Sequence, residues 1–272
     1  MDRKHDQLAS LVNAVKASAK YRDVNQELIT RIAAQELSKG RSEKDAIKAT
    51  KNKLHQVGGA YLDKREHYTR WLDDLEMAAR TGQRERLLEL CRIIMSHHAS
   101  TRERIPILEQ FYTRIFRELP PIRSILDIAC GLNPLAIPWM PLPENGIEYY
   151  AYDIYHGMMD FLQAWLGIMH VGGNAQVRDM IQTCPTQPAD VAFLLKAIPC
   201  LEQVDKAAGH RLLSELHASN LVVSFPIQSL GGRSKGMLEH YETHFYKLLG
   251  NELRWEVKKL VFDTELVFVV RK

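Results

Sequence analysis

The first hundred residues carry apolar side chains at the spacing of α-helices. Leu8, Leu11, Val12 and Val15 recur three, four and seven positions apart, which places them on one face of a helix. The same kind of spacing recurs in four further stretches, over residues 28–33, 42–57, 68–79 and 83–95. The chain is therefore predicted to be all-helical up to about residue 104.

Two serines have the spacing that begins a helix. Ser42 and Ser100 each precede an acidic residue by three positions, which is typical of a capping box. A helix that begins at Ser100 would carry Arg102 and Arg104 in its first turn, where positive charge opposes the helix dipole. At least one of these arginines is therefore expected to have an anionic partner.

Beyond about residue 105 the pattern changes to short apolar runs that alternate with helical segments. The runs cover residues 124–128, 149–153, 190–195 and 221–225, and the predicted helices cover residues 158–169 and 207–217. Strands that alternate with helices form a parallel sheet. Two β-rich runs near the end, residues 253–260 and 266–270, predict an antiparallel hairpin. The pattern predicts an α/β domain over residues 105–272, with the Rossmann-like sheet of class I methyltransferases, after a helical domain over residues 1–104.

Composition and cysteine spacing argue against a membrane protein, a secreted protein and a zinc protein. No apolar run in the 272 residues approaches the roughly 18 uncharged residues that a membrane span needs. The charges at the start of the chain are not followed by the apolar segment of a secretory signal. The four cysteines lie far apart without a CxxC pair, which argues against a zinc site or a disulfide framework. We expect a protein of the reducing cytoplasm, with no membrane partner and no metal.

The charge is distributed unevenly along the chain. Residues 1–104 hold 21 Lys and Arg against 15 Asp and Glu, a net charge of +6, while the remainder has a net charge of −3. A basic half joined to a slightly acidic half suggests that the helical part meets a polyanion. Helical surfaces rich in lysine are also common without any partner, so charge alone leaves both interpretations open.

Three acidic residues are expected at the ends of successive strands. Asp127 is followed by a turn of small residues that includes Gly131, which is how methyltransferases hold the amino acid part of S-adenosylmethionine. Asp153 has the position of an acid that hydrogen-bonds both ribose hydroxyls of a nucleotide-type cofactor. Asp179 could accept a hydrogen bond from an adenine amine. One such acid is a weak signal, but three together favour a cofactor site.

Two later features could serve a substrate. Lys196 directly follows an apolar run, and its ammonium could face substrate at the sheet edge or simply reach the surface from an apolar stem. Residues 224–237 carry three glycines and two basic residues, and they begin with Ser-Phe-Pro and end with Met237. A loop of this composition is suited to contact phosphates or a displaced base.

These segments together resemble the aminoglycoside-resistance 16S rRNA methyltransferases, the Arm/Rmt family together with the enzymes of aminoglycoside-producing actinomycetes. The matching segments are residues 18–21, 53–56, 59–61, 98–104, 127–136, 194–199, 224–226, 229–237 and 265–267. The resemblance implies methyl transfer from S-adenosyl-L-methionine to N7 of guanine 1405 in the decoding site of the 30S subunit. It also implies that the helical domain docks on rRNA and that the protein is a monomer.

The resemblance assigns roles to individual residues. Arg104 would pair with the methionine carboxylate, and Asp179 with Met180 would frame the adenine. The implied cofactor-binding residues are Tyr61, His98, Ala99, Ser100, Thr101, Arg102, Glu103, Arg104, Ala129, Gly131, Asp153, Asp179, Met180 and Leu195. The implied RNA-binding residues are Lys20, Lys48, Lys51, Lys53, Lys196, Gln228, Arg233, Lys235 and Met237.

No general base is assigned, because guanine N7 has a free lone pair and no proton to remove. One position departs from the family, since Gln228 stands where related enzymes usually have Lys or Arg. That change removes a phosphate contact and raises two alternatives. The chain could be a weak or inactive homologue that binds 30S, or it could methylate a neighbouring nucleotide, such as an adenine at N1.

Overall fold

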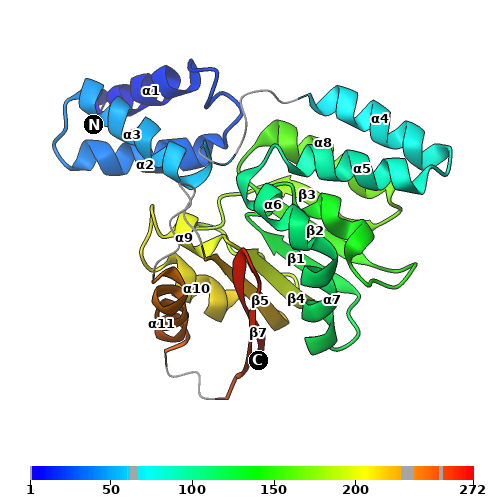
Figure 1. Ribbon diagram of the computed structural model, residues 1–272. Coiled ribbons are helices and arrows are strands. Elements are labelled where there is room, and N and C mark those ends of the chain that lie inside the picture. The colour runs from blue at the N-terminus through cyan, green and yellow to red at the C-terminus, as the bar shows by residue number, and fades with distance from the viewer. Residues whose placement is uncertain (1, 60, 62–66, 228–235, 251–253) are drawn as a thin grey trace.

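A seven-stranded β-sheet forms the centre of the molecule (Figure 1). The structure, a computed structural model, describes residues 2–59, 61, 67–227, 236–250 and 254–272. The strands are β1 (Ser124–Ile128), β2 (Glu148–Asp153), β3 (Gly172–Val177), β4 (Ala189–Leu195), β5 (Ala218–Pro226), β6 (Glu256–Val261) and β7 (Glu265–Arg271). Their order is β3-β2-β1-β4-β5-β7-β6, and β7 runs opposite to the other six strands. The predicted parallel sheet with a reversed last strand is confirmed.

The described helices surround this sheet. They are α1 (Asp2–Lys16), α2 (Gln26–Ser38), α3 (Glu43–Leu54), α4 (Tyr68–Arg80), α5 (Arg84–Met95), α6 (Ala99–Arg104), α7 (Leu108–Glu118), α8 (His156–Ile168), α9 (Ile198–Leu201), α10 (Ala208–Glu215) and α11 (Met237–Leu249). A π-helical turn, η1 (His55–Gly59), continues α3, and two 3₁₀ turns are η2 (Ile105–Ile107) and η3 (Asn133–Trp139). None of the described helices is long and apolar enough to cross a membrane.

The helical part of the chain packs as two groups. Helices α1, α2 and α3 pack on one another as a bundle, at the upper left of Figure 1. Helices α4 and α5 instead lie on α8, where Tyr68 stacks on Phe161 with ring centroids 5.2 Å apart. Ser42 caps α3 as predicted, because its hydroxyl accepts the Asp45 N–H at 3.2 Å. The boundary at residue 104 between two domains stays a prediction.

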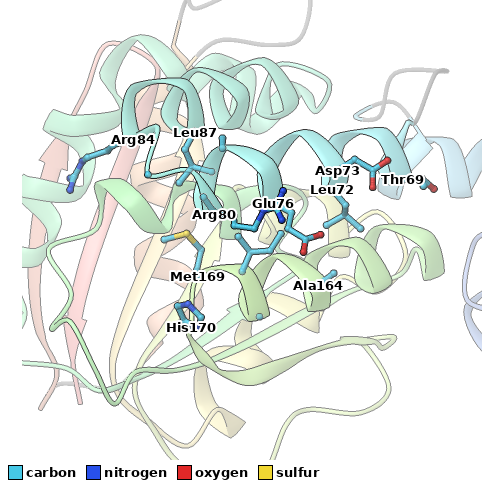
Figure 2. Close-up of a pocket in the computed structure, with 15 residues that line it drawn as sticks. Thr69, Leu72, Asp73, Glu76, Arg80, Arg84, Leu87, Ala164, Met169 and His170 are labelled. Atoms are coloured by element: carbon cyan, nitrogen blue, oxygen red, sulfur yellow. The ribbon is translucent and has the colours of Figure 1, made fainter.

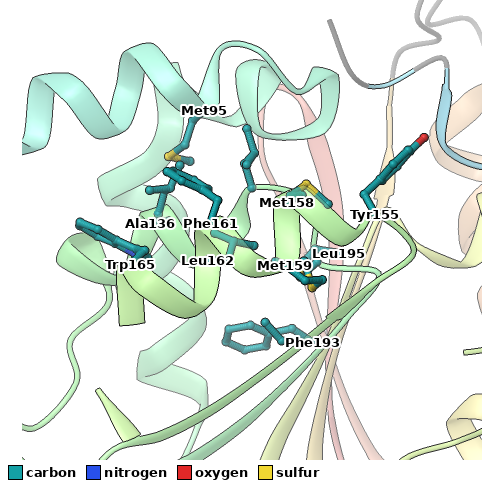
Figure 3. Close-up of a cluster of buried hydrophobic side chains, with 14 of the residues drawn as sticks. Met95, Ala136, Tyr155, Met158, Met159, Phe161, Leu162, Trp165, Phe193 and Leu195 are labelled. Carbon is teal, nitrogen blue, oxygen red and sulfur yellow. The ribbon is translucent and has the colours of Figure 1, made fainter. Parts of the chain in front are cut away.

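The core lies on both faces of the sheet. On the α8 face, Phe161, Leu162 and Trp165 are fully buried together with Phe193 of β4 (Figure 3). The Trp165 indole donates a hydrogen bond to the backbone carbonyl of Pro134 at 2.8 Å, so this large side chain is buried without an unpaired polar atom. The opposite face is covered by α10 and α11.

Strand β3 and helices α7, α9 and α11 lie outside the strands and helices predicted from the sequence. Strand β3 reads Gly-Gly-Asn-Ala-Gln-Val, with Val177 as its one β-branched residue and no aromatic residue, so it carries little of the composition that marks strands. It forms because the edge of β2 offers a parallel partner over six residues. Helices α7 and α11 do carry buried apolar residues at helical spacing, so the sequence contains the signal for both.

Candidate functional site

A cavity opens where strands β2 and β4 end and where the turn after β1 approaches them. It is lined by Val57, Gly58, Tyr61, His98, Ser100, Ala129, Asp153, Ile154, Tyr155, Leu195, Lys196, Ala197, Cys200 and Leu201. Ligands of open α/β sheets bind at the carboxyl ends of the strands. Six of the residues that the resemblance assigns to the cofactor line this cavity: Tyr61, His98, Ser100, Ala129, Asp153 and Leu195.

A larger hollow lies elsewhere, between α4, α5 and the end of α8 (Figure 2). It measures about 1060 Å³ and is lined by side chains of mixed charge, such as Glu76, Arg80 and His170. No strand ends there, and none of the predicted site residues lines it. We therefore place the candidate site at the strand ends, although the hollow of Figure 2 is larger.

Asp153 is the acidic group of the cavity. Its Oδ2 accepts the Gly131 N–H at 2.9 Å and its Oδ1 accepts the Ile154 N–H at 2.6 Å. Burial raises the pKa of this carboxyl group, and the two backbone hydrogen bonds oppose that rise. Because each carboxylate oxygen has a second lone pair, both can accept a further hydrogen bond from two adjacent hydroxyls.

The turn after β1 depends on backbone conformations that few residues adopt. Ala129 has φ 52° and Gly131 has φ 53°, both in the left-handed region. A Cβ on Gly131 would lie 2.7 Å from Cε1 of His98. Ala129 shows that a side chain is tolerated at this φ, so glycine is favoured at position 131 mainly because its absent side chain lets the turn approach the His98 ring.

His98 is held as a neutral imidazole. Withdrawal of the ring from water, together with the positive charges of Arg104 and Lys196, lowers the pKa of His98 to about 3. The Ser100 hydroxyl lies 2.9 Å from Nδ1, and the Tyr61 ring stacks at a centroid distance of 6.1 Å. The ring therefore lines the cavity without bringing a charge to it at neutral pH.

The predicted helix start at Ser100 is wrong. Helix α6 has only six residues and begins at Ala99, with His98 as the N-cap residue. Arg102 and Arg104 consequently lie in the last turn, where positive charge favours the helix dipole.

Arg104 nevertheless has the anionic partner that was expected. Its side chain is 1% exposed and donates from Nε and Nη2 to Glu265 at 2.7 and 3.0 Å, and from Nη1 to Asn133 at 2.8 Å. The partner belongs to this chain, and Arg104 is not among the residues that line the cavity. Its pairing with a cofactor carboxylate stays a prediction.

Lys196 lies inside the protein and not at an exposed sheet edge. The residue has φ 58° and is 7% exposed, and its ammonium lies 2.7 Å from a Glu103 oxygen and 3.5 Å from a Glu265 oxygen. Burial alone would raise the pKa of Glu265, but Arg104 and Lys196 hold it below its ordinary value. The interpretation that the ammonium of Lys196 reaches the surface is wrong. Lys196 does line the cavity at the end of β4, and its role toward substrate or RNA stays a prediction.

Asp127 also differs from its prediction. It lies within β1, is fully buried, and accepts hydrogen bonds at Oδ2 from the Tyr149 hydroxyl at 2.6 Å and from Asn133 Nδ2 at 2.8 Å. Burial raises the pKa of Asp127 to about 6 against the lowering effect of these hydrogen bonds. Asp127 is not among the residues that line the cavity, and its hydrogen bonds join β1 to Tyr149 of β2 and to Asn133 after the turn.

Asp179 follows β3 but faces a partner from the helical bundle. Its Oδ2 accepts hydrogen bonds from Nε and Nη2 of Arg31 at 3.0 and 2.6 Å, and its Oδ1 accepts the Ile181 N–H at 3.1 Å. Met180 is buried next to it. Sequence reasoning missed Arg31, because its partner lies 148 positions away.

Other residues of the 98–104 segment do not line the cavity but form hydrogen bonds that hold this segment in place beside it. Ala99 N–H donates to the Tyr61 carbonyl at 2.8 Å, and Thr101 donates from its hydroxyl to the Met95 carbonyl at 2.6 Å. Arg102 donates to the Ser96 carbonyl at 3.2 Å.

The cavity also contains residues that the sequence did not single out: Val57, Gly58, Ile154, Tyr155, Ala197, Cys200 and Leu201. Position after a predicted strand could have indicated Ile154, Tyr155 and Ala197, whereas nothing in the sequence marked the others.

Apart from Lys196, the predicted RNA-binding residues fall into four groups. Lys20 and Lys48 are exposed on the bundle, and Lys20 Nζ lies 2.8 Å from Nδ1 of His55. Lys51 and Lys53 are half-buried, and Lys53 donates to the Gln203 carbonyl at 3.2 Å. Met237 is the first residue of α11 and is partly exposed. The positions outside the described residues are Gln228, Arg233 and Lys235.

We predict that Gly131→Ala destabilises the protein more than Gly82→Ala does. Both glycines have positive φ, but a Cβ at Gly82 meets no atom within 4 Å, whereas one at Gly131 meets the His98 ring. The Gly82 variant should lose roughly 1 kcal/mol of unfolding free energy from backbone strain alone. Urea unfolding of both variants measures the difference, and equal losses would contradict the close contact at His98.

Comparison with known proteins gives a consistent answer. Residues 17–269 match the family model described as ribosomal RNA methyltransferase (FmrO). The chain is 38% identical to a 16S rRNA (guanine(1405)-N(7))-methyltransferase of Micromonospora rosea, over 98% of this chain and 97% of that protein. An enzyme with the same description from Serratia marcescens is 33% identical over 96% of this chain and 97% of its own length.

The same relationship holds for solved structures. The 16S rRNA methyltransferase RmtF, crystallised with S-adenosyl-L-homocysteine, superposes with a TM-score of 0.81 at 30% identity, over 100% of this chain and 99% of that chain. The 16S rRNA methylase RmtB superposes with a TM-score of 0.76 at 28% identity, over 97% of this chain and 98% of that chain. This chain belongs to the FmrO family of ribosomal RNA methyltransferases.

Proposed function

We propose that this chain transfers a methyl group from S-adenosyl-L-methionine to N7 of guanine 1405 of 16S rRNA and thereby confers aminoglycoside resistance. Its substrate is the assembled 30S subunit in the cytoplasm, and it acts as a monomer. The observation that carries the proposal is the Asp153 carboxylate, buried at the end of β2 beside the turn at Gly131. Full-length relatives at 33–38% identity share the guanine-1405 description.

The residues of the cavity fit the parts of such a cofactor. The two oxygens of Asp153 each keep a lone pair for one ribose hydroxyl. Tyr61 and His98 form an aromatic wall, and the turn at Ala129 and Gly131 brings backbone close to the ligand. Asp179 and Met180 are assigned to the adenine, and Arg104 to the methionine carboxylate.

Methyl transfer to guanine N7 depends on the positioning of the two reactants more than on proton transfer. S-adenosylmethionine supplies the methyl group, and guanine N7 presents an in-plane lone pair with no proton to remove. His98, with its lowered pKa, is neutral, and burial raises the pKa of the Cys200 thiol to about 11, so neither group adds charge to the cavity at neutral pH. The protein therefore contributes alignment of the two reactants and exclusion of water.

The bundle of α1–α3 is assigned to rRNA docking. Exposed lysines on it include Lys20, Lys44 and Lys48, and residues 1–104 carry a net charge of +6. Contacts of lysine with phosphates supply salt-dependent affinity without base specificity. Selection of one guanine then depends on a base turned out of its stack, with Met237 placed at the start of α11 to support it.

Transfer of labelled methyl groups tests the proposal. Intact 30S subunits should accept label from S-adenosylmethionine, and primer extension after chemical cleavage should place it at guanine 1405. Retained 30S binding without transfer would identify an inactive docking homologue, and label at an adenine N1 would identify a different target. Expression in a susceptible bacterium should give resistance to gentamicin and kanamycin with apramycin sensitivity retained.

We predict that Asp153→Ala largely abolishes S-adenosylmethionine binding. Two hydrogen bonds to a charged acceptor are lost, at roughly 1.5–3 kcal/mol each. Calorimetry measures the affinity, and Asp160→Ala serves as the matched control because Asp160 is exposed on α8. Wild-type affinity in the Asp153 variant would overturn the cofactor assignment.

We predict that the double variant Lys44→Glu and Lys48→Glu loses 30S affinity by about tenfold or more, with a shallower salt dependence. Its affinity for S-adenosylmethionine should not change, because both side chains are exposed on α3 outside the cavity. Lys258→Glu, with its side chain 65% exposed on the edge strand β6, is the control for a charge change elsewhere. If 30S affinity is unaltered, the lysines are only solvated.

We predict that Met237→Ala slows methyl transfer and leaves 30S affinity nearly unchanged. A side chain that supports a displaced base acts mainly on the way to the transition state. Single-turnover rates and 30S binding, measured on the same preparation, separate the two effects. Weaker docking with an unchanged rate would mean that Met237 only clamps the RNA.

A further inference from the structure

The α1–α3 bundle forms hydrogen bonds and an ion pair with both loops that would hold the adenosine part of the cofactor. One loop follows β2 and contains Ile154 and Tyr155, which line the cavity beside Asp153. The other follows β3 and contains Asp179. Each loop has its own anchor on the bundle, and the two anchors lie on α2 and on the segment that precedes it.

The first anchor joins the chain before α2 to the loop after β2. Val24 forms an antiparallel bridge with Tyr155, and the Asn25 N–H donates to the Ile154 carbonyl at 2.7 Å. The Asp23 carboxylate accepts the Gly157 N–H at 3.0 Å, in the first turn of α8. Helix α8 has no capping side chain of its own, so an acid from the bundle caps it.

The second anchor is the ion pair between Arg31 and Asp179. Arg31 reaches from α2 with its side chain 13% exposed, and the Asp179 side chain is 3% exposed. Two donors of the guanidinium share one carboxylate oxygen, which fixes the direction of the carboxylate. The other oxygen holds the Ile181 N–H, so both ends of Asp179 are oriented.

The end of the bundle also forms part of the cavity wall. Val57 and Gly58 of the π-helical turn line the cavity together with Tyr61. A Cβ on Gly58 would lie 2.6 Å from the Tyr155 hydroxyl, so the turn lies directly against the loop after β2. The position of the bundle against the loop after β2 therefore determines the shape of the cavity on this side.

We propose that Arg31 is a positioning residue that couples the two binding events, so that cofactor binding and nucleic-acid docking on the bundle strengthen each other. Whichever ligand binds first orders the contact between the bundle and the two loops, and the second then meets a smaller ordering cost. The coupling acts in both directions by thermodynamic linkage. This inference rests on the proposed function, because it takes the cofactor and the 30S subunit as the two ligands.

The test measures 30S affinity with and without S-adenosylhomocysteine, and cofactor affinity by calorimetry on the free protein. We expect saturating S-adenosylhomocysteine to tighten 30S binding of the wild-type protein by about fivefold or more, the lower end of measured couplings. Arg31→Met should weaken S-adenosylhomocysteine binding and bring this ratio close to one. Arg31→Lys should retain part of the coupling, because one ammonium replaces a forked pair of donors.

Arg41→Met is the matched control. Arg41 forms an ion pair with Glu36 at 2.9 Å, wholly within the bundle, so its loss removes the same charge without touching either loop. This variant should keep both the cofactor affinity and the coupling ratio of the wild type. Urea unfolding of the Arg31 variants checks that the bundle remains folded.

The outcomes separate this inference from the proposed function. If the wild-type protein binds S-adenosylhomocysteine and 30S with no mutual effect, the coupling is wrong while the proposed function stands. The coupling is also wrong if Arg31→Met and Arg41→Met behave alike. If the wild-type protein binds neither ligand, the proposed function fails and the coupling fails with it.

Discussion

The buried ion pair between Arg104 and Glu265 joins the helical segment before the sheet to the strand that completes it. Both side chains are almost fully buried, so each charge depends on the other, and loss of one partner of such a pair costs roughly 3–5 kcal/mol. Glu265 also accepts a hydrogen bond from Ser224 at 2.7 Å and lies 3.5 Å from the Lys196 ammonium. Glu265 therefore connects Arg104, Ser224 and Lys196, and Lys196 has Glu103 as a second and closer partner at 2.7 Å.

The reversed strand is what brings that carboxylate to the site. β7 runs antiparallel to β5, so its first residue lies opposite Pro226, at the edge where the parallel strands end. A parallel last strand would present its final residue there and would place its first residue at the other edge. The reversal thus supplies an anion at the same edge as Arg104 and Lys196, and it compensates the buried charge of Arg104.

The sequence predicted the sheet and the position of the cavity because both depend on local pattern. Apolar runs separated by helical periods identify β1, β2, β4 and β5, and Asp153 follows from its place at a strand end. Pairing across long separations leaves no local trace, so the partners of Arg104, Lys196 and Asp179 were not predictable. The error at Ser100 has a related cause, because a serine–acid spacing predicts a cap only when the serine side chain is free. Here its hydroxyl lies against His98.

Asp127 and Asp153 show how one sequence signal leads to two structures. Both are acids at or near the end of a parallel strand, and both precede a turn. The difference is in the neighbours, since Tyr149 and Asn133 donate side-chain hydrogen bonds to one oxygen of Asp127, whereas Asp153 holds only backbone N–H groups. Side-chain donors enclose Asp127 within the core. The backbone donors to Asp153 come from Gly131 in the turn and from Ile154, the next residue, and they leave its remaining lone pairs to the cavity, which makes it the acid that a ligand can reach.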